Sequence, residues 1–224
     1  MLGLDAATPP ATVALVRGDR ELAHRTGPFG PQTDAWILAA VDEMLRSAEM
    51  EIAQLDCIAA GCGPGTFTGI RVALAAALGL AAGAGVQVCG IGSLDALAEG
   101  AQAATGRVAS LDVLALVDAR RQQHYALRAF VEPAPARITH VEGPAAIDTE
   151  ALIASLEENP PAVCVGATLQ LPDNVQWVEG PPLAVSIARL AARMPAAERP
   201  PALPSYLRPP DAVPGVSPLR RRRP

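Results

Sequence analysis

The stretch GCGPGTFTGIRVALAAALGLAAG, residues 61–83, joins a glycine-rich turn to a long apolar segment. Amide groups at a helix N-terminus can bind an anion, and glycine lets a ligand approach the backbone closely. Thr66 or Thr68 can cap the helix that follows. The turn matches neither the P-loop motif, which needs a lysine, nor the dinucleotide fingerprint, whose third glycine is missing. From spacing alone, a phosphate cradle and a purely structural turn both stay open.

The apolar segment after the turn predicts a helix that reaches about Gly83. From Ile70 to Ala82 its only charged residue is Arg71, so this helix has no polar face and needs cover on more than one side. A second helix, expected at 34–48 with Thr33 as its N-cap, can supply part of that cover. The rest comes either from this chain or from another protein, and the sequence alone leaves both open.

The same order of elements occurs twice along the chain. Short strands flank Asp5 in the first half and Asp118 in the second, and in each half a helix and a further strand follow. This repeat predicts two similar α/β lobes with mixed sheets. The expected divisions are a lobe at 1–105, a smaller lobe at 106–199 and a Pro/Arg-rich extended tail at 200–224. Helices are expected at 34–48, 69–83, 93–105, 148–159 and 183–194.

The composition excludes several kinds of chemistry. All 18 basic residues are arginine, so neither a phosphate-binding lysine nor a Schiff-base lysine is available. The net charge is −5 even with the run Arg220–Arg223, so the body is not expected to bind a polyanion alone. No C-x-x-C pair occurs and the histidines are scattered, so no metal site is expected. Buried reduced thiols are expected at Cys57, Cys62, Cys89 and Cys164.

Two features bear on location. The start of the chain lacks the basic and apolar regions of a signal peptide. Residues 72–94 carry no charge, which raises the question of a membrane span, but the run is rich in alanine and glycine and is broken at 83–85. We expect a cytoplasmic protein that does not enter a membrane.

The segment LDAAT, residues 4–8, has two interpretations. An aspartate at a strand end before a threonine turn resembles the first phosphate hairpin of actin- and sugar-kinase-like ATPases, and it is also a common turn cap. Ala7 stands where a glycine lets the backbone reach a phosphate, and no glycine follows Asp118 in the second half. A nucleotide site formed by Asp5 and Thr8 is therefore expected to be weak and degenerate.

Four segments in this order resemble the TsaB (YeaZ) family: LGLDAATPPATVALV, the glycine turn with its helix, VDARRQQHYA and PSYLR. The resemblance covers about residues 1–208. Relatives often carry a histidine near the start of the first helix, where this chain has Gln32 and Thr33, and the arginine-rich end lies outside the family pattern. The most specific motif is the loop made of Gly63, Pro64, Gly65, Thr66, Phe67, Thr68, Gly69 and Arg71.

This resemblance implies an accessory subunit of bacterial tRNA threonylcarbamoyladenosine biosynthesis, in the Gcp-like superfamily. It implies a duplicated actin/hexokinase-like (ASKHA, RNase H-like) fold without catalysis or a bound cofactor of its own, although the complex uses ATP. The expected partner is the paralogous catalytic subunit TsaD, which moves a threonylcarbamoyl group to the adenosine beside the anticodon of ANN-decoding tRNAs. TsaE joins the complex, a TsaC-type synthase acts indirectly, and tRNA is contacted only through the complex. A homodimer is also possible.

TsaB-like proteins pair through the two helices that match 34–48 and 69–83 here, so the loop is interpreted as the element that positions a partner surface. The expected interface residues are Ile37, Val41, Met44, Ala73, Leu74, Ala77 and Leu78. The alternative is an autonomous ATP-dependent small-molecule kinase of the same fold, which would need intact Gly-Thr phosphate hairpins and a catalytic carboxylate. A metallopeptidase would need an H-x-x-x-H pair, which the sequence lacks.

Overall fold

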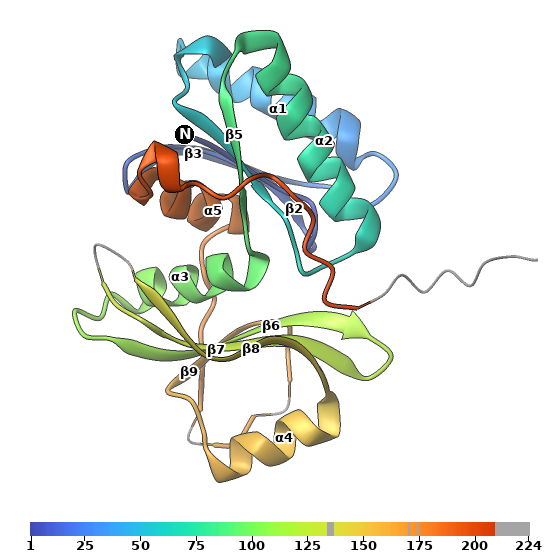
Figure 1. The fold of residues 1–224 in the computed structure, drawn as a ribbon, viewed down its shortest axis with the longest axis vertical. Coiled ribbons are helices and arrows are strands. Elements are labelled where there is room, and N and C mark those ends of the chain that lie inside the picture. The colour runs from blue at the N-terminus through green and yellow to red at the C-terminus, as the bar shows by residue number, and fades with distance from the viewer. Residues whose placement is uncertain (134–136, 170, 174, 209–224) are drawn as a thin grey trace, which may run out of the picture.

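The first half of the chain folds around a five-stranded mixed sheet. The computed structural model describes residues 1–133, 137–169, 171–173 and 175–208 (Figure 1). The strand order is β3-β2-β1-β4-β5, in which β1 runs antiparallel to β2 and parallel to β4. The strands are β1 (Leu2–Asp5), β2 (Ala11–Arg17), β3 (Arg20–Gly27), β4 (Cys57–Gly61) and β5 (Gln87–Ile91).

The second half repeats this sheet. Its order is β10-β9-β6-β7-β8, in which β6 runs antiparallel to β7 and parallel to β9, so β6 has the place that β1 has in the first sheet. The strands are β6 (Leu111–Arg120), β7 (Gln123–Val131), β8 (Ile138–Asp148), β9 (Val163–Gly166) and β10 (Gln176–Trp177). The shared order confirms the predicted duplicated actin/hexokinase-like α/β fold. The short strand β10 was not predicted, because two residues carry no recognisable alternation.

The helices separate and cover the two sheets (Figure 1). Helices α1 and α2 pack on one face of the first sheet, and α5 packs on its other face. Helix α3 lies between α5 and the second sheet, whose far face is covered by α4. The helices are α1 (Thr33–Ser47), α2 (Phe67–Ala84), α3 (Ser93–Thr105), α4 (Thr149–Glu158) and α5 (Leu183–Arg193), all within two residues of the predicted ranges.

Small residues let these layers approach closely. Successive side chains of β4 alternate between the two faces: Ile58 and Ala60 join the core under α1 and α2, whereas Cys57 and Ala59 join the core under α5. A Cβ atom on Gly3 would overlap the backbone carbonyl of Ala184 in α5. The core of this chain, with few aromatic residues, is therefore closed by close contact between alanine-rich helices and the sheet.

The lobe boundaries proposed at 105 and 199 stay a prediction, and two helices exchange places relative to them. Helix α3 comes before the first boundary but packs against β6 of the second sheet. Helix α5 comes before the second boundary but packs against β1 and β2 of the first sheet. Arg220–Arg223 lie outside the described residues.

Local predictions agree with the structure except at one cap. Asp148 caps α4, with its side chain accepting a hydrogen bond from the amide of Glu150, as expected. Thr33 was expected to cap α1 and does not: it is the first helical residue, and its hydroxyl bonds back to Pro28 and Gly30. All four cysteines are free thiols, three of them buried on strands and Cys62 half-buried in the loop after β4.

Helix α2 is, in the described part of the chain, long and apolar enough to cross a membrane by length and composition. It connects β4 to β5, two parallel strands that pair directly, and its inner side packs on that sheet. A membrane span would require this helix to leave the sheet. We therefore interpret α2 as a helix that covers the first sheet and has an unusually apolar outer side.

Candidate functional site

The loop between β4 and α2 is tied to the first turn of the chain. The Thr66 amide donates to the Ala7 carbonyl at 2.8 Å, and the Thr66 hydroxyl caps α2 by accepting from the Gly69 amide at 3.2 Å. Cβ atoms on Gly65 and Gly69 would overlap the backbone of Ala7 and Ala6. The glycines of the motif therefore serve close contact between two backbone segments, which favours the structural turn over the phosphate cradle.

The first turn uses its own donors internally. One carboxylate oxygen of Asp5 accepts from the Thr8 hydroxyl at 2.8 Å and the Thr8 amide at 3.2 Å, and the other accepts from the Ala7 amide at 3.3 Å. Asp5 is fully buried, and this burial raises the pKa of its carboxyl from 3.8 to about 6, against the opposing effect of these hydrogen bonds. The amides that would hold a phosphate thus hold Asp5, as a turn cap does.

A cleft of about 490 Å³ lies between the two sheets and is lined by residues of both halves of the chain. Thr8 lines it, but Asp5 lies beneath its surface. Asp118 also lines the cleft and is paired with Arg120, through an ion pair of 3.3 Å and the Arg120 amide at 2.7 Å. The predicted nucleotide site at Asp5 and Thr8 therefore keeps only Thr8 at the cleft surface, and nucleotide binding stays a prediction.

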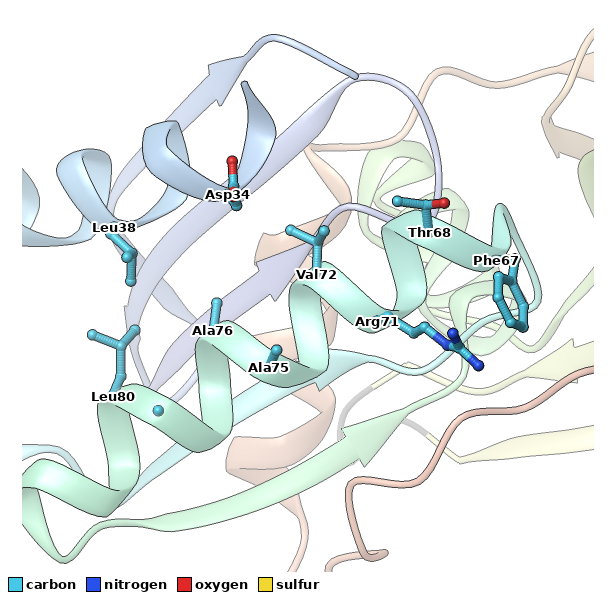
Figure 2. Close-up of a pocket in the computed structure, with 10 residues that line it drawn as sticks. Asp34, Leu38, Phe67, Thr68, Arg71, Val72, Ala75, Ala76 and Leu80 are labelled. Carbon is cyan, nitrogen blue, oxygen red and sulfur yellow. The ribbon is translucent and has the colours of Figure 1, made fainter. Parts of the chain in front are cut away.

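A second concavity, of about 790 Å³, runs along the outer side of α1 and α2 (Figure 2). We call it the α1–α2 groove. Its floor is almost wholly apolar, with one charged residue from each helix, Asp34 and Arg71. Leu38 of α1 is 48% exposed in this groove, and Leu78, on the exposed side of α2, is 51% exposed. The groove is lined by Asp34, Leu38, Phe67, Thr68, Arg71, Val72, Ala75, Ala76, Gly79 and Leu80.

The expected interface residues lie mostly on the other side of these helices. Leu78 is exposed as predicted, but the remaining six are buried against the first sheet: Ile37, Val41, Met44, Ala73, Leu74 and Ala77. The prediction that these six face a partner is wrong for the folded chain, since their side chains already form its core. The wrong side of α2 was predicted because both of its sides are apolar, so the hydrophobic pattern does not show which one is exposed. The charged Arg71 indicates the exposed side, since residues 75, 78, 79 and 82 follow it at helical spacing and are exposed.

An aromatic cluster closes one end of the groove. The guanidinium of Arg71 lies 3.7 Å from the centre of the Phe67 ring, and its Nε donates to the Tyr206 hydroxyl at 3.3 Å. The rings of Phe67 and Tyr206 are 5.2 Å apart, in a tilted stack. Arg71 was predicted only as part of the family motif, and its contact with Tyr206, 135 residues away, could not be read from spacing.

No group of three or more His, Cys, Asp and Glu side chains in the described residues could hold a metal ion. The buried thiols of Cys57 and Cys89 lie 3.5 Å apart on neighbouring strands, without a third ligand of this kind. The candidate functional features in the described residues are the α1–α2 groove and the cleft between the sheets.

Comparison with known proteins gives concordant matches. A family model described as TsaD, tRNA N6-adenosine threonylcarbamoyltransferase, matches residues 32–174. The chain is 39% identical over 130 residues to the tRNA threonylcarbamoyladenosine biosynthesis protein TsaB of Haemophilus influenzae, a match that covers 56% of this chain but only 51% of that protein. It is 30% identical over 225 residues to a Mycobacterium tuberculosis protein described as uncharacterized, covering 96% and 94% of the two chains.

A solved structure supports the fold. A Pseudomonas aeruginosa protein described as similar to the peptidase YeaZ superposes with a TM-score of 0.69, at 24% identity, over 92% of this chain and 98% of that chain. At this identity the match concerns the arrangement of the two sheets and their helices.

Proposed function

Since the chain belongs to the TsaB (YeaZ) family of the Gcp-like superfamily, we propose that it is a noncatalytic subunit of tRNA threonylcarbamoyladenosine biosynthesis. Its role is to bind and activate TsaD, the subunit that transfers the threonylcarbamoyl group to the adenosine beside the anticodon of ANN-decoding tRNAs. It acts in the cytoplasm and contacts tRNA only as part of the complex with TsaD and TsaE. It binds no cofactor by itself, and the ATP is used by the complex.

The observation that carries this proposal is the α1–α2 groove. An exposed apolar concavity lined by ten residues of two helices is typical of a protein interaction site. The small side chains Ala75, Ala76 and Gly79 allow the backbone of a partner helix to approach closely. A partner built on the same duplicated fold can offer a matching pair of helices, so the groove suits TsaD, or a second copy of this chain when TsaD is absent.

The state of the phosphate turn argues against the autonomous kinase. Asp5 is buried and its turn amides are occupied, so it cannot reach a metal–nucleotide complex without breaking the first turn. Ala7 is also fully buried under the loop that holds Thr66. A noncatalytic subunit that supports a catalytic paralogue needs neither a free Asp5 carboxylate nor free amides in the first turn.

Reconstitution tests the proposal. The chain is combined with TsaD and TsaE of the same organism, a TsaC-type synthase, ATP, bicarbonate, threonine and tRNA, and modified adenosine is measured. Ala75→Asp places a carboxylate in the groove; its desolvation at an interface is expected to weaken TsaD binding at least about 100-fold and to abolish stimulation. The control is Val108→Asp, at a side chain that is 92% exposed and outside the groove. Equal activity of both variants would overturn the proposal.

A further inference from the structure

The last described residues form a strap that joins both halves of the molecule. We call residues 199–208 the C-terminal strap; in Figure 1 it is the red segment that leaves α5, crosses the first sheet and ends beside the second. The Pro200 carbonyl accepts from the Gly90 amide of β5 at 3.1 Å, and the Ser205 amide donates to the Cys62 carbonyl at 2.7 Å. At its far end, Arg208 donates to the Gln123 side chain of β7 at 3.0 Å.

The strap fits closely against the loop that carries the family motif. A Cβ atom on Gly63 would lie 2.8 Å from the Ser205 carbonyl, and one on Gly90 would lie 2.9 Å from the Pro201 carbonyl. Both distances are too short for a side chain, so only glycine at these positions admits the strap. The path of the strap is therefore fixed on either side of the groove's aromatic end, and Tyr206 follows directly after Ser205.

Tyr206 holds two residues that line the groove but does not line it itself. Phe67 and Arg71 are among the lining residues, and Figure 2 shows their side chains together at one end of α2. Tyr206 stacks on Phe67 and accepts a hydrogen bond from Arg71. Since Phe67 and Tyr206 are 39% and 40% exposed, packing alone does not fix these side chains. The three contacts among them limit the rotamers that Phe67 and Arg71 can adopt.

We propose that Tyr206 is a positioning residue for partner docking. It holds Phe67 and Arg71 in the orientation that they present to a protein bound in the α1–α2 groove, so the rotamer entropy of both is lost on folding of the chain and not on association. The inference rests on the proposed function, since it takes TsaD as the bound protein. Tyr206 thus acts on docking through Phe67 and Arg71, which line the groove.

The test compares three variants of the full-length chain. Tyr206→Ala removes the stack and the hydrogen bond, and we expect its Kd for TsaD to rise about 10-fold. Tyr206→Phe keeps the ring but removes the acceptor for Arg71, and we expect a rise of about 3-fold. Leu203→Ala is the control, because Leu203 lies on the same strap, is 65% exposed and does not line the groove; its Kd should match that of the wild type.

A readout independent of TsaD separates positioning from stability. The Nε–H signal of Arg71 in a nitrogen-15 NMR spectrum should move and broaden in both Tyr206 variants of the free chain and stay unchanged in Leu203→Ala. Unchanged TsaD affinity in a folded Tyr206→Phe and Tyr206→Ala pair would overturn the inference, and so would an equal loss in Leu203→Ala. If wild-type chain does not bind TsaD at all, the proposed function fails and this inference falls with it.

Discussion

Asp5 provides a sharp test of the claim that the first turn is structural. Its carboxyl is buried, and its pKa is raised from 3.8 to about 6. Between these values the folded chain binds a proton that the unfolded chain does not, so the free energy of unfolding falls as pH rises through this window. A shift of about two units corresponds to about 3 kcal/mol, which is present at pH 4 and lost above pH 6.

Asp5→Asn removes this titration while keeping the shape of the side chain. The amide has one oxygen for the donors of Ala7 and Thr8, so one donor loses its acceptor, at a cost of about 1–3 kcal/mol. We therefore expect the variant to be clearly less stable than wild type at pH 4. At pH 7 the variant should equal the wild type or exceed it by up to about 2 kcal/mol, because the wild type has by then lost about 3 kcal/mol to the burial of the charge and the amide does not titrate.

The assay is urea unfolding at pH values from 4 to 7, with the free energy of unfolding extrapolated to water. Asp118→Asn is the control, since Asp118 is the exposed counterpart in the second half, and its profile should follow that of the wild type. An Asp5→Asn profile that also follows the wild type would refute the reasoning. Steady ATP hydrolysis by the pure chain, lost in Asp5→Ala, would give Asp5 a catalytic role and contradict the proposed function.

Three further predictions concern packing and the tail. Gly69→Ala should destabilise the chain by at least about 2 kcal/mol in thermal melts, because its Cβ overlaps the Ala6 carbonyl, whereas Gly83→Ala, in open space on the same helix, should stabilise it by up to about 1 kcal/mol. Arg128→Met should cost about 3 kcal/mol in urea unfolding, because it leaves the largely buried Asp112 carboxylate without its partner at 2.7 Å. Truncation after Arg208 should leave the melting temperature and the reconstituted activity unchanged; lower tRNA modification with normal TsaD binding would instead give the arginine run a salt-dependent role on RNA.

The architecture could be predicted from the sequence, because strands and helices leave periodic patterns of apolar residues and the same order of elements occurs twice. Strand, turn and strand around Asp5 return around Asp118, and both copies form the same order of strands. The exchange of α3 and α5 between the sheets was beyond such reasoning. The sequence does not say which sheet the apolar side of a helix covers; in the structure α5 packs on the first sheet, where Gly3 lets Ala184 approach closely.

The candidate site was predicted at the level of the helices but not of their faces. The apolar composition of residues 70–82 predicted a helix without a polar face, and in the structure Arg71 is the one charged residue of this range on the outer side of α2. It could not give the phase, because Ala73 and Ala75 look alike in the sequence while one is core and the other lines the groove. The contact of Tyr206 with Arg71 was also hidden, since no periodic pattern links residues in separate segments.

Photo-crosslinking tests the central claim that TsaD docks in the α1–α2 groove. A benzoylphenylalanine replaces Leu38, which is 48% exposed in the groove, or Phe130, which is 46% exposed on β7 of the second sheet. The account predicts that the chain labelled at 38 crosslinks to TsaD on illumination and that the chain labelled at 130 does not. Crosslinking from 130 alone, or from neither position while the complex forms, would contradict it.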